Sequence, residues 1–197
     1  MKKFSLFLFL LSFLLQAQAQ KQDYIPISIS YYGEWAYHPG IKIGSEYTFW
    51  QRDGKEKPNK DRTHLHSFLV TGNLGFYVHP NNHTGITLTS DVGYRFRRRN
   101  GWRIENFLSL GYMAAINAGE TYKLDANGQA KKVPVASRSY LWVGAVFGWG
   151  QDLAVHNIPI AWFLRHTVAL QVPYNTMGFA PRLYIDIGLT YCIGRSF

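Results

Sequence analysis

Cysteine is nearly absent from the 197-residue sequence, and acidic residues are scarce. The single cysteine, Cys192, excludes an internal disulfide. Beyond residue 20, no apolar run approaches the roughly 18 residues that a membrane-spanning helix needs. Sustained helical periodicity is also missing. The chain therefore offers neither a disulfide-stapled fold nor a helical one.

The N-terminus is the one place with a long apolar run, and residues 1–19 have the features of a secretory signal peptide. Two lysines give a positive start, residues 4–15 form an apolar run, and Ala17-Gln18-Ala19 supplies the small residues before cleavage. The run is too short for a spanning anchor, which needs about 20 residues. We therefore predict export and a mature single domain at 20–197.

The charge balance of the mature chain is basic. Removal of Lys2 and Lys3 leaves 21 − 2 = 19 basic residues against 12 acidic ones, a net charge of +7. Such a balance suits nucleic acid or an anionic surface. Export argues against nucleic acid and favours anionic lipopolysaccharide as a neighbour.

Alternating apolar and polar residues between turn signals predict eight β-strands and an all-β fold. Asn100-Gly101 is the most specific turn signal, because a two-residue type I′ turn needs positive φ at both positions. Residues 152–157 have room for one helical turn. The predicted strands cover 24–36, 41–51, 64–78, 86–98, 101–114, 139–150, 158–172 and 182–193.

The two faces of these strands favour a membrane barrel. In 182–193 one face carries Ile185, Ile187 and Leu189, and the other mixes small and charged residues such as Asp186 and Thr190. The mixed face suits a crowded barrel interior, with the aliphatic face against lipid. A soluble β-protein uses the same alternation with the apolar face inside, and this alternative stays open.

Aromatic residues recur toward the strand ends, as in the interfacial girdles of membrane barrels. Together with strand count and chain length, they predict an eight-stranded antiparallel transmembrane β-barrel whose interior is filled by side chains. The predicted girdle residues are Trp35, Tyr37, Trp50, Tyr94, Trp102, Tyr112, Tyr140, Trp149, Trp162 and Tyr191.

With its signal peptide, alternating strands, aromatic belts and C-terminal Phe197, the chain resembles the small eight-stranded outer-membrane proteins of the OmpA/OmpX-type class. The resemblance implies an outer-membrane location and recognition of the last strand by the barrel-assembly machinery. We expect no cofactor. It leaves the oligomeric state open. In this class the odd-numbered connections are the long, external ones. Here the first connection, at His38-Pro39-Gly40, is short, and the second, 52–63, is long and charged.

Seven charged residues fall on the mixed faces and are predicted to point into the lumen. They form either a polar pathway with a gate or an ion-pair network that fills the barrel. We favour the network, because eight strands leave no open pore and buried charges need partners. The predicted lumen charges are Glu46, Asp91, Arg95, Arg103, Glu105, Arg165 and Asp186.

Histidines offer two incomplete metal-binding pairs. His64 and His66 share a strand face, and His79 and His83 share a loop. No cysteine or acidic pair completes either ligand set in the sequence, so no metal site is expected.

Residues 163–191 are faintly similar to the outer-membrane lipid A deacylases, barrels that use a His-x-Ser pair and a carboxylate. The resemblance would make His166 the catalytic histidine. However, Val168 stands at the serine position and no glutamate follows Glu120. A histidine without a nucleophile has nothing to activate, so catalysis is not expected.

The favoured role is structural, adhesive or ligand-binding, carried by surface loops, chiefly 115–138. Two alternatives stay open. One is a lipid A deacylase-like enzyme of the outer membrane. The other is a soluble periplasmic barrel that holds an apolar ligand.

Overall fold

The structure is a computed structural model that describes residues 24–34, 38–54, 64–125, 127–133, 135–174 and 178–194. The predicted signal peptide lies outside the described residues, as do Trp35, Tyr37 and Phe197. Among the described residues, no helix is long and apolar enough to cross a membrane.

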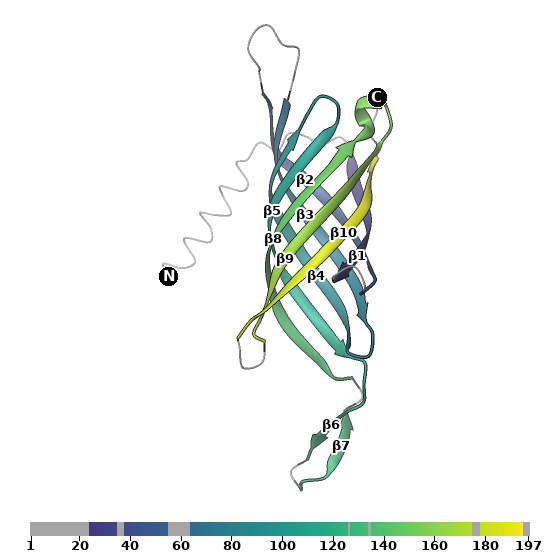
Figure 1. The fold of residues 1–197 in the computed structure, drawn as a ribbon, viewed down its shortest axis with the longest axis vertical. Helices are drawn as coiled ribbons and strands as arrows, with labels where there is room; N and C mark the ends of the chain where they lie inside the picture. The colour runs from purple at the N-terminus through teal and green to yellow at the C-terminus, as the bar shows by residue number, and fades with distance from the viewer. Residues whose placement is uncertain are drawn as a thin grey trace, which may run out of the picture.

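Eight long strands close into one antiparallel barrel, in the order β1-β10-β9-β8-β5-β4-β3-β2 (Figure 1). This arrangement confirms the predicted fold class. The strands are β1 (Ile25–Glu34), β2 (Gly40–Gly54), β3 (His64–His79), β4 (His83–Arg97), β5 (Trp102–Asn117), β8 (Ser137–Asp152), β9 (Ile160–Val172) and β10 (Ala180–Ile193).

Pairing of the first strand with the last closes the barrel. β1 and β10 stay in register from the pair Ile25 and Ile193 to the pair Glu34 and Tyr184. A bilayer offers no water to hydrogen-bond an open sheet edge, so only a closed ring of strands satisfies the backbone there. The eight strands have no open lateral edge.

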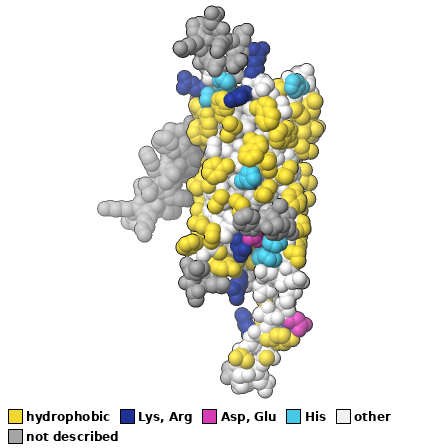
Figure 2. Space-filling model, viewed as in Figure 1, with side chains coloured by type: hydrophobic (Ala, Val, Ile, Leu, Met, Phe, Trp, Pro, Cys, Tyr) yellow, Lys and Arg dark blue, Asp and Glu magenta, His cyan; other side chains and the backbone are white. Residues whose placement is uncertain are grey.

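The barrel wall is apolar outside and polar inside. On β10, Ile187 and Leu189 are 56% and 50% exposed, whereas Asp186 and Thr190 are 0% and 2% exposed. Figure 2 shows hydrophobic side chains across the visible face of the wall. This orientation contradicts the alternative of a soluble barrel with an apolar interior, because such a large exposed apolar surface needs lipid or a partner against it.

Aromatic side chains pack against one another on the outer wall. Trp50 contacts Phe68 with ring centroids 5.6 Å apart, and Trp102 contacts Trp162 at 5.5 Å. Tyr140, a predicted girdle residue, is instead buried in the lumen at 7% exposure. It shares the inward side of β8 with Trp142, so the strand register overrides the interfacial preference of tyrosine at this position.

The connections divide between two ends of the barrel. The loop end carries the β1–β2, β3–β4, β5–β8 and β9–β10 connections, and the terminal end carries the other three together with the start of β1 and the end of β10 (Figure 1). At the terminal end β2 continues to Gly54, so residues 52–54 of the long second connection belong to the wall. A 3-10 turn, η1 (Leu153–His156), follows β8 in the segment with room for one.

The β5–β8 connection, expected as a long polar surface loop at 115–138, contains two further short strands. β5 runs to Asn117 and β8 starts at Ser137. Between them, β6 (Thr121–Leu124) and β7 (Ala130–Val133) pair as a two-stranded hairpin that projects from the barrel (Figure 1).

A pair of matched leucine substitutions tests the lipid-facing wall. Leu108, near the middle of β5, is 51% exposed, and Leu124, on the hairpin, is 76% exposed. We expect Leu108→Arg to lower the free energy of unfolding in lipid by about 2–4 kcal/mol, because the arginine would sit near the bilayer midplane. Leu124→Arg should leave the stability unchanged. Equal effects in urea titrations of the two variants would contradict a membrane-embedded wall.

Candidate functional site

The middle of the lumen holds a charge network centred on Glu105 of β5. Glu105 accepts hydrogen bonds from Arg95 Nε and Arg165 Nε, each at 2.7 Å, and lies 3.3 Å from Arg103 Nε. Arg95 also forms a two-pronged pair with Glu46, at 2.7 and 2.6 Å. The structure thus brings five of the seven predicted lumen charges into contact.

The other two predicted charges have partners of their own. Asp186 pairs with Lys42, a lumen cation absent from the predicted set. Asp91 accepts hydrogen bonds from Asn73 at 2.9 Å and from Thr71 at 3.1 Å. Lys42 lies four residues before Glu46 on the same face of β2, and this spacing was the sequence signal for it.

The charges in this part of the lumen balance. Lys42, Arg95, Arg103 and Arg165 are four cations, and Glu46, Asp91, Glu105 and Asp186 are four anions. Buried charges of one sign would cost several kcal/mol each without such compensation. The arrangement supports the ion-pair interpretation over a gated polar pathway.

An aromatic layer fills the lumen between the charges and the loop end. The ring of Tyr184 stacks on Tyr32 at 5.1 Å and contacts Trp142 at 4.8 Å and Tyr77 at 5.5 Å. None of these four side chains is more than 2% exposed. Gly85 makes room for this layer, because a Cβ there would lie 2.2 Å from the ring of Tyr77.

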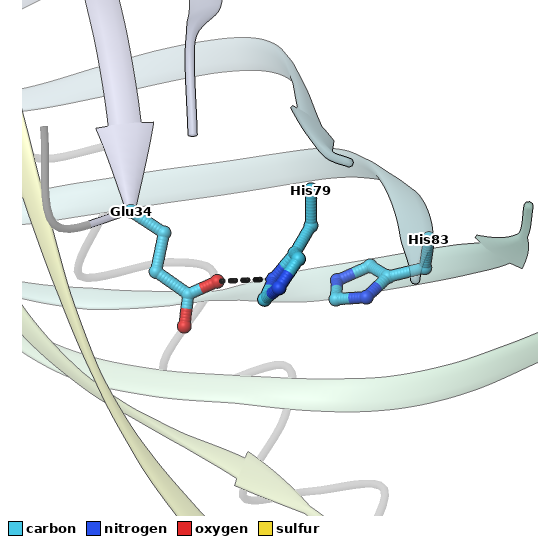
Figure 3. A group of neighbouring side chains, drawn as sticks. All are labelled: Glu34, His79 and His83. Atoms are coloured by element: carbon cyan, nitrogen blue, oxygen red, sulfur yellow. Dashed lines mark ion pairs between the residues drawn. The ribbon is translucent and has the colours of Figure 1, made fainter. Parts of the chain in front are cut away.

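At the loop end, beyond the aromatic layer, Glu34 lies close to three histidines. Glu34 is the last residue of β1, His79 ends β3 and His83 begins β4 (Figure 3). His79 and His83 are a cross-strand pair, so their side chains lie on the same side of the sheet. His38 forms an isolated backbone β-bridge with Glu34, and its ring stacks on the ring of His79 with centroids 3.7 Å apart.

The two carboxylate oxygens of Glu34 have different surroundings. Oε1 accepts a hydrogen bond from Arg182 Nη1 at 2.6 Å. Oε2 is buried without a hydrogen bond and faces Nδ1 of His38 at 3.6 Å and Nδ1 of His79 at 3.7 Å. Glu34 is therefore the acidic partner that the histidine pair lacks in the sequence. The sequence offers no cysteine or acidic pair for these histidines, and the structure places a single acid from a distant strand beside them.

A cavity of about 350 Å³ lies beside this cluster at the loop end. Its lining includes His83, Tyr174 and two cations, Arg138 and Arg182, together with Glu120 from the start of the hairpin. The loop end thus combines a polar, partly basic hollow with imidazole and carboxylate groups. The aromatic layer around Tyr184 separates this hollow from the charge network.

The remaining candidate histidines lie on the outer wall. His166 has Phe147 and Ile185 as cross-strand neighbours, and its ring lies 5.2 Å from that of Trp149. The adjacent hydroxyl, on Thr167, is 4% exposed and points into the lumen. The surroundings of His166 are therefore apolar.

His64 and His66 lie near Phe96, on the same wall toward the terminal end. His66 also pairs with the hydroxyl of Tyr94. Neither residue belongs to the cluster around Glu34.

Comparisons with known proteins add little to this geometry. No family model matches the chain, and no curated protein sequence matches it. Among solved structures, it is similar to Ail, the attachment invasion locus protein of Yersinia pestis, crystallised with the heparin analogue sucrose octasulfate. That comparison covers 87% of this chain and 100% of Ail, with 16% identity and a TM-score of 0.33. A likeness at this level assigns no function, which must come from the residues themselves.

Glu105 offers a direct test of the charge network. We expect Glu105→Gln to lower the free energy of unfolding by about 3–5 kcal/mol, because three buried arginines lose their shared anion. Denaturant unfolding of the lipid-embedded protein measures the change. Glu120→Gln on the hairpin is the matched control and should unfold like the wild type. A wild-type unfolding midpoint for Glu105→Gln would contradict the network.

Proposed function

We propose that this protein is an outer-membrane barrel that binds an anionic partner at the cell surface through its loop end. The observation that carries the proposal is a pair of facing lysines on the projecting hairpin. Lys123 of β6 and Lys131 of β7 are directly opposite each other in the register. Like charges in this position destabilise a hairpin. A bound anion would attract both lysines and so offset their mutual repulsion.

The other charges of the hairpin do not cancel this pair. Glu120 accepts a hydrogen bond from Tyr122 at 2.6 Å and pairs with Lys132. The hydrogen bonds from Lys132 and Tyr122 hold the pKa of Glu120 below its usual value, so this carboxylate stays ionised and engaged. Asp125 accepts backbone hydrogen bonds within the hairpin turn.

The hairpin also exposes apolar side chains that a partner would cover. Tyr122 is 54% exposed, Leu124 is 76% exposed, and Val135, just beyond β7, is 66% exposed. A two-stranded hairpin is at best marginally stable alone in water. Contact with a partner through these side chains would stabilise it, which supports a binding role over a purely structural one.

The proposed location rests on the outer wall and on the predicted signal peptide. The apolar wall would contact outer-membrane lipid and lipopolysaccharide, and the alternating residues of β10 suit recognition by the barrel-assembly machinery. The resemblance to the OmpA/OmpX-type class implies that the β5–β8 connection faces outside. The hairpin would then meet partners beyond the cell.

Binding of a polyanion tests the hairpin. We expect the barrel in lipid nanodiscs to bind dextran sulfate but not neutral dextran, and salt should weaken the binding because exposed charges are screened. Replacing Lys123 and Lys131 by Ser should weaken binding by about 1–2 kcal/mol, roughly tenfold, at about 0.5–1 kcal/mol per exposed ion pair. Biolayer interferometry measures the affinity.

The matched control removes two cations from the terminal end, by Arg98→Ser with Arg99→Ser. Both residues lie in the exposed β4–β5 turn. This double variant should bind dextran sulfate like the wild type. Equal losses in the two double variants, or equal binding of neutral dextran, would contradict a hairpin site for anions.

One preparation tests both the membrane location of the protein and the closure of its lumen. We expect the protein to sediment with outer membranes, to need detergent for extraction, and to give no conductance steps in planar bilayers, because side chains fill the lumen. Recovery in the soluble periplasmic fraction would contradict the location. Stepwise conductance would contradict a filled lumen and would restore the polar-pathway interpretation.

A further inference from the structure

We propose that Glu34, His79 and His83 form a binding site for a divalent transition-metal ion, of which Zn²⁺ is the representative. One ligand atom from each residue lies within 4.8 Å of the others. The three come from β1, β3 and β4, and the strand pairing places them at one mouth of the barrel (Figure 3). This site is separate from the lysine pair of the hairpin and does not require the anionic partner.

The distances around Glu34 suit a shared ion better than direct hydrogen bonds. Its Oε2 lies 3.7 Å from Nδ1 of His79, and both atoms are buried without a hydrogen-bond partner. Hydrogen bonds between nitrogen and oxygen are about 2.7–3.2 Å long. Ligands at about 2.0–2.1 Å from a tetrahedral zinc ion are about 3.3 Å apart. Side-chain shifts of about 1 Å would therefore complete the coordination.

Neighbouring groups orient the ligands in the way that metal sites require. Arg182 holds Oε1 of Glu34 at 2.6 Å, which fixes the carboxylate and leaves Oε2 toward the histidines. The hydroxyl of Tyr77 lies 3.1 Å from Nε2 of His83. Partners of this kind set the orientation and the tautomer of a ligating imidazole, and their loss lowers metal affinity about 10–100-fold.

The ligand set indicates the class of ion. Two imidazoles and one carboxylate suit Zn²⁺, Cu²⁺ or Ni²⁺, whereas Mg²⁺ and Ca²⁺ prefer sites made of oxygen atoms. Three protein ligands leave a fourth position. His38 stacks on His79 with ring centroids 3.7 Å apart, its Nδ1 lies 3.6 Å from Oε2 of Glu34, and the cavity at the loop end reaches His83.

Zinc binding to the full-length folded barrel in detergent, after treatment with a chelator, tests the site. We expect a single Zn²⁺ per barrel by isothermal titration calorimetry at neutral pH, and no comparable binding of Mg²⁺. His79→Gln and His83→Gln should each lower the zinc affinity roughly tenfold or more, and Tyr77→Phe should lower it about tenfold without removing a ligand. His156→Gln, on exposed η1, should bind zinc like the wild type.

Nuclear magnetic resonance of the unaltered protein keeps the test valid if a variant fails to fold. Zinc should shift the ring nitrogen signals of His79 and His83 and leave those of His156 and His166 in place. Shifts at His156 or His166 with none at the cluster would overturn the proposal. So would zinc affinity that all the variants share, or Mg²⁺ binding equal to that of Zn²⁺.

Discussion

Closure of the backbone hydrogen-bond ring between β1 and β10 is the constraint from which the other features follow. Inside a bilayer the strands have no water as a partner, so the sheet must end where it began. A ring of eight strands has an interior just wide enough for side chains. The interior must then be filled, and its charges must balance. The outer side chains must be apolar, since each strand turns every second residue to lipid.

This constraint moves ligand chemistry to the ends of the barrel. Charges around Glu105 and the aromatic layer around Tyr184 occupy the middle of the lumen. At the loop end the strands finish, and the side chains there are not constrained by the packing of the lumen. There the chain can hold a carboxylate near imidazoles, a cavity with arginines, and a hairpin with unbalanced lysines. The mouth and the hairpin are therefore where this barrel differs from an inert membrane-spanning ring.

The period-two pattern was enough to predict the eight strands of the barrel and their two faces, because each strand carries that signal within its own dozen residues. The girdle signal, not the alternation, failed at Tyr140: an aromatic near a strand end fits both a girdle and a lumen, and the alternation places Tyr140 on the face of β8 opposite Trp149. The hairpin was not predicted, because it lies in a polar segment and its strands β6 and β7 have only four residues each. Contacts between segments far apart in the sequence could not be predicted, because no residue near Lys42 or Glu34 in the sequence indicates Asp186 or His79 as the partner.

The orientation of the wall is most directly tested by nuclear Overhauser contacts between lipid acyl chains and protein methyl groups in a bilayer-like nanodisc. The barrel contains its own controls, because Leu69 and Val146 are 0% and 2% exposed inside the lumen, whereas Ile187 and Leu189 stand on the wall. We predict strong lipid contacts for Ile187 and Leu189 and none for Leu69 and Val146. Lipid contacts at Leu69 and Val146 with none at Ile187 and Leu189 would contradict the account.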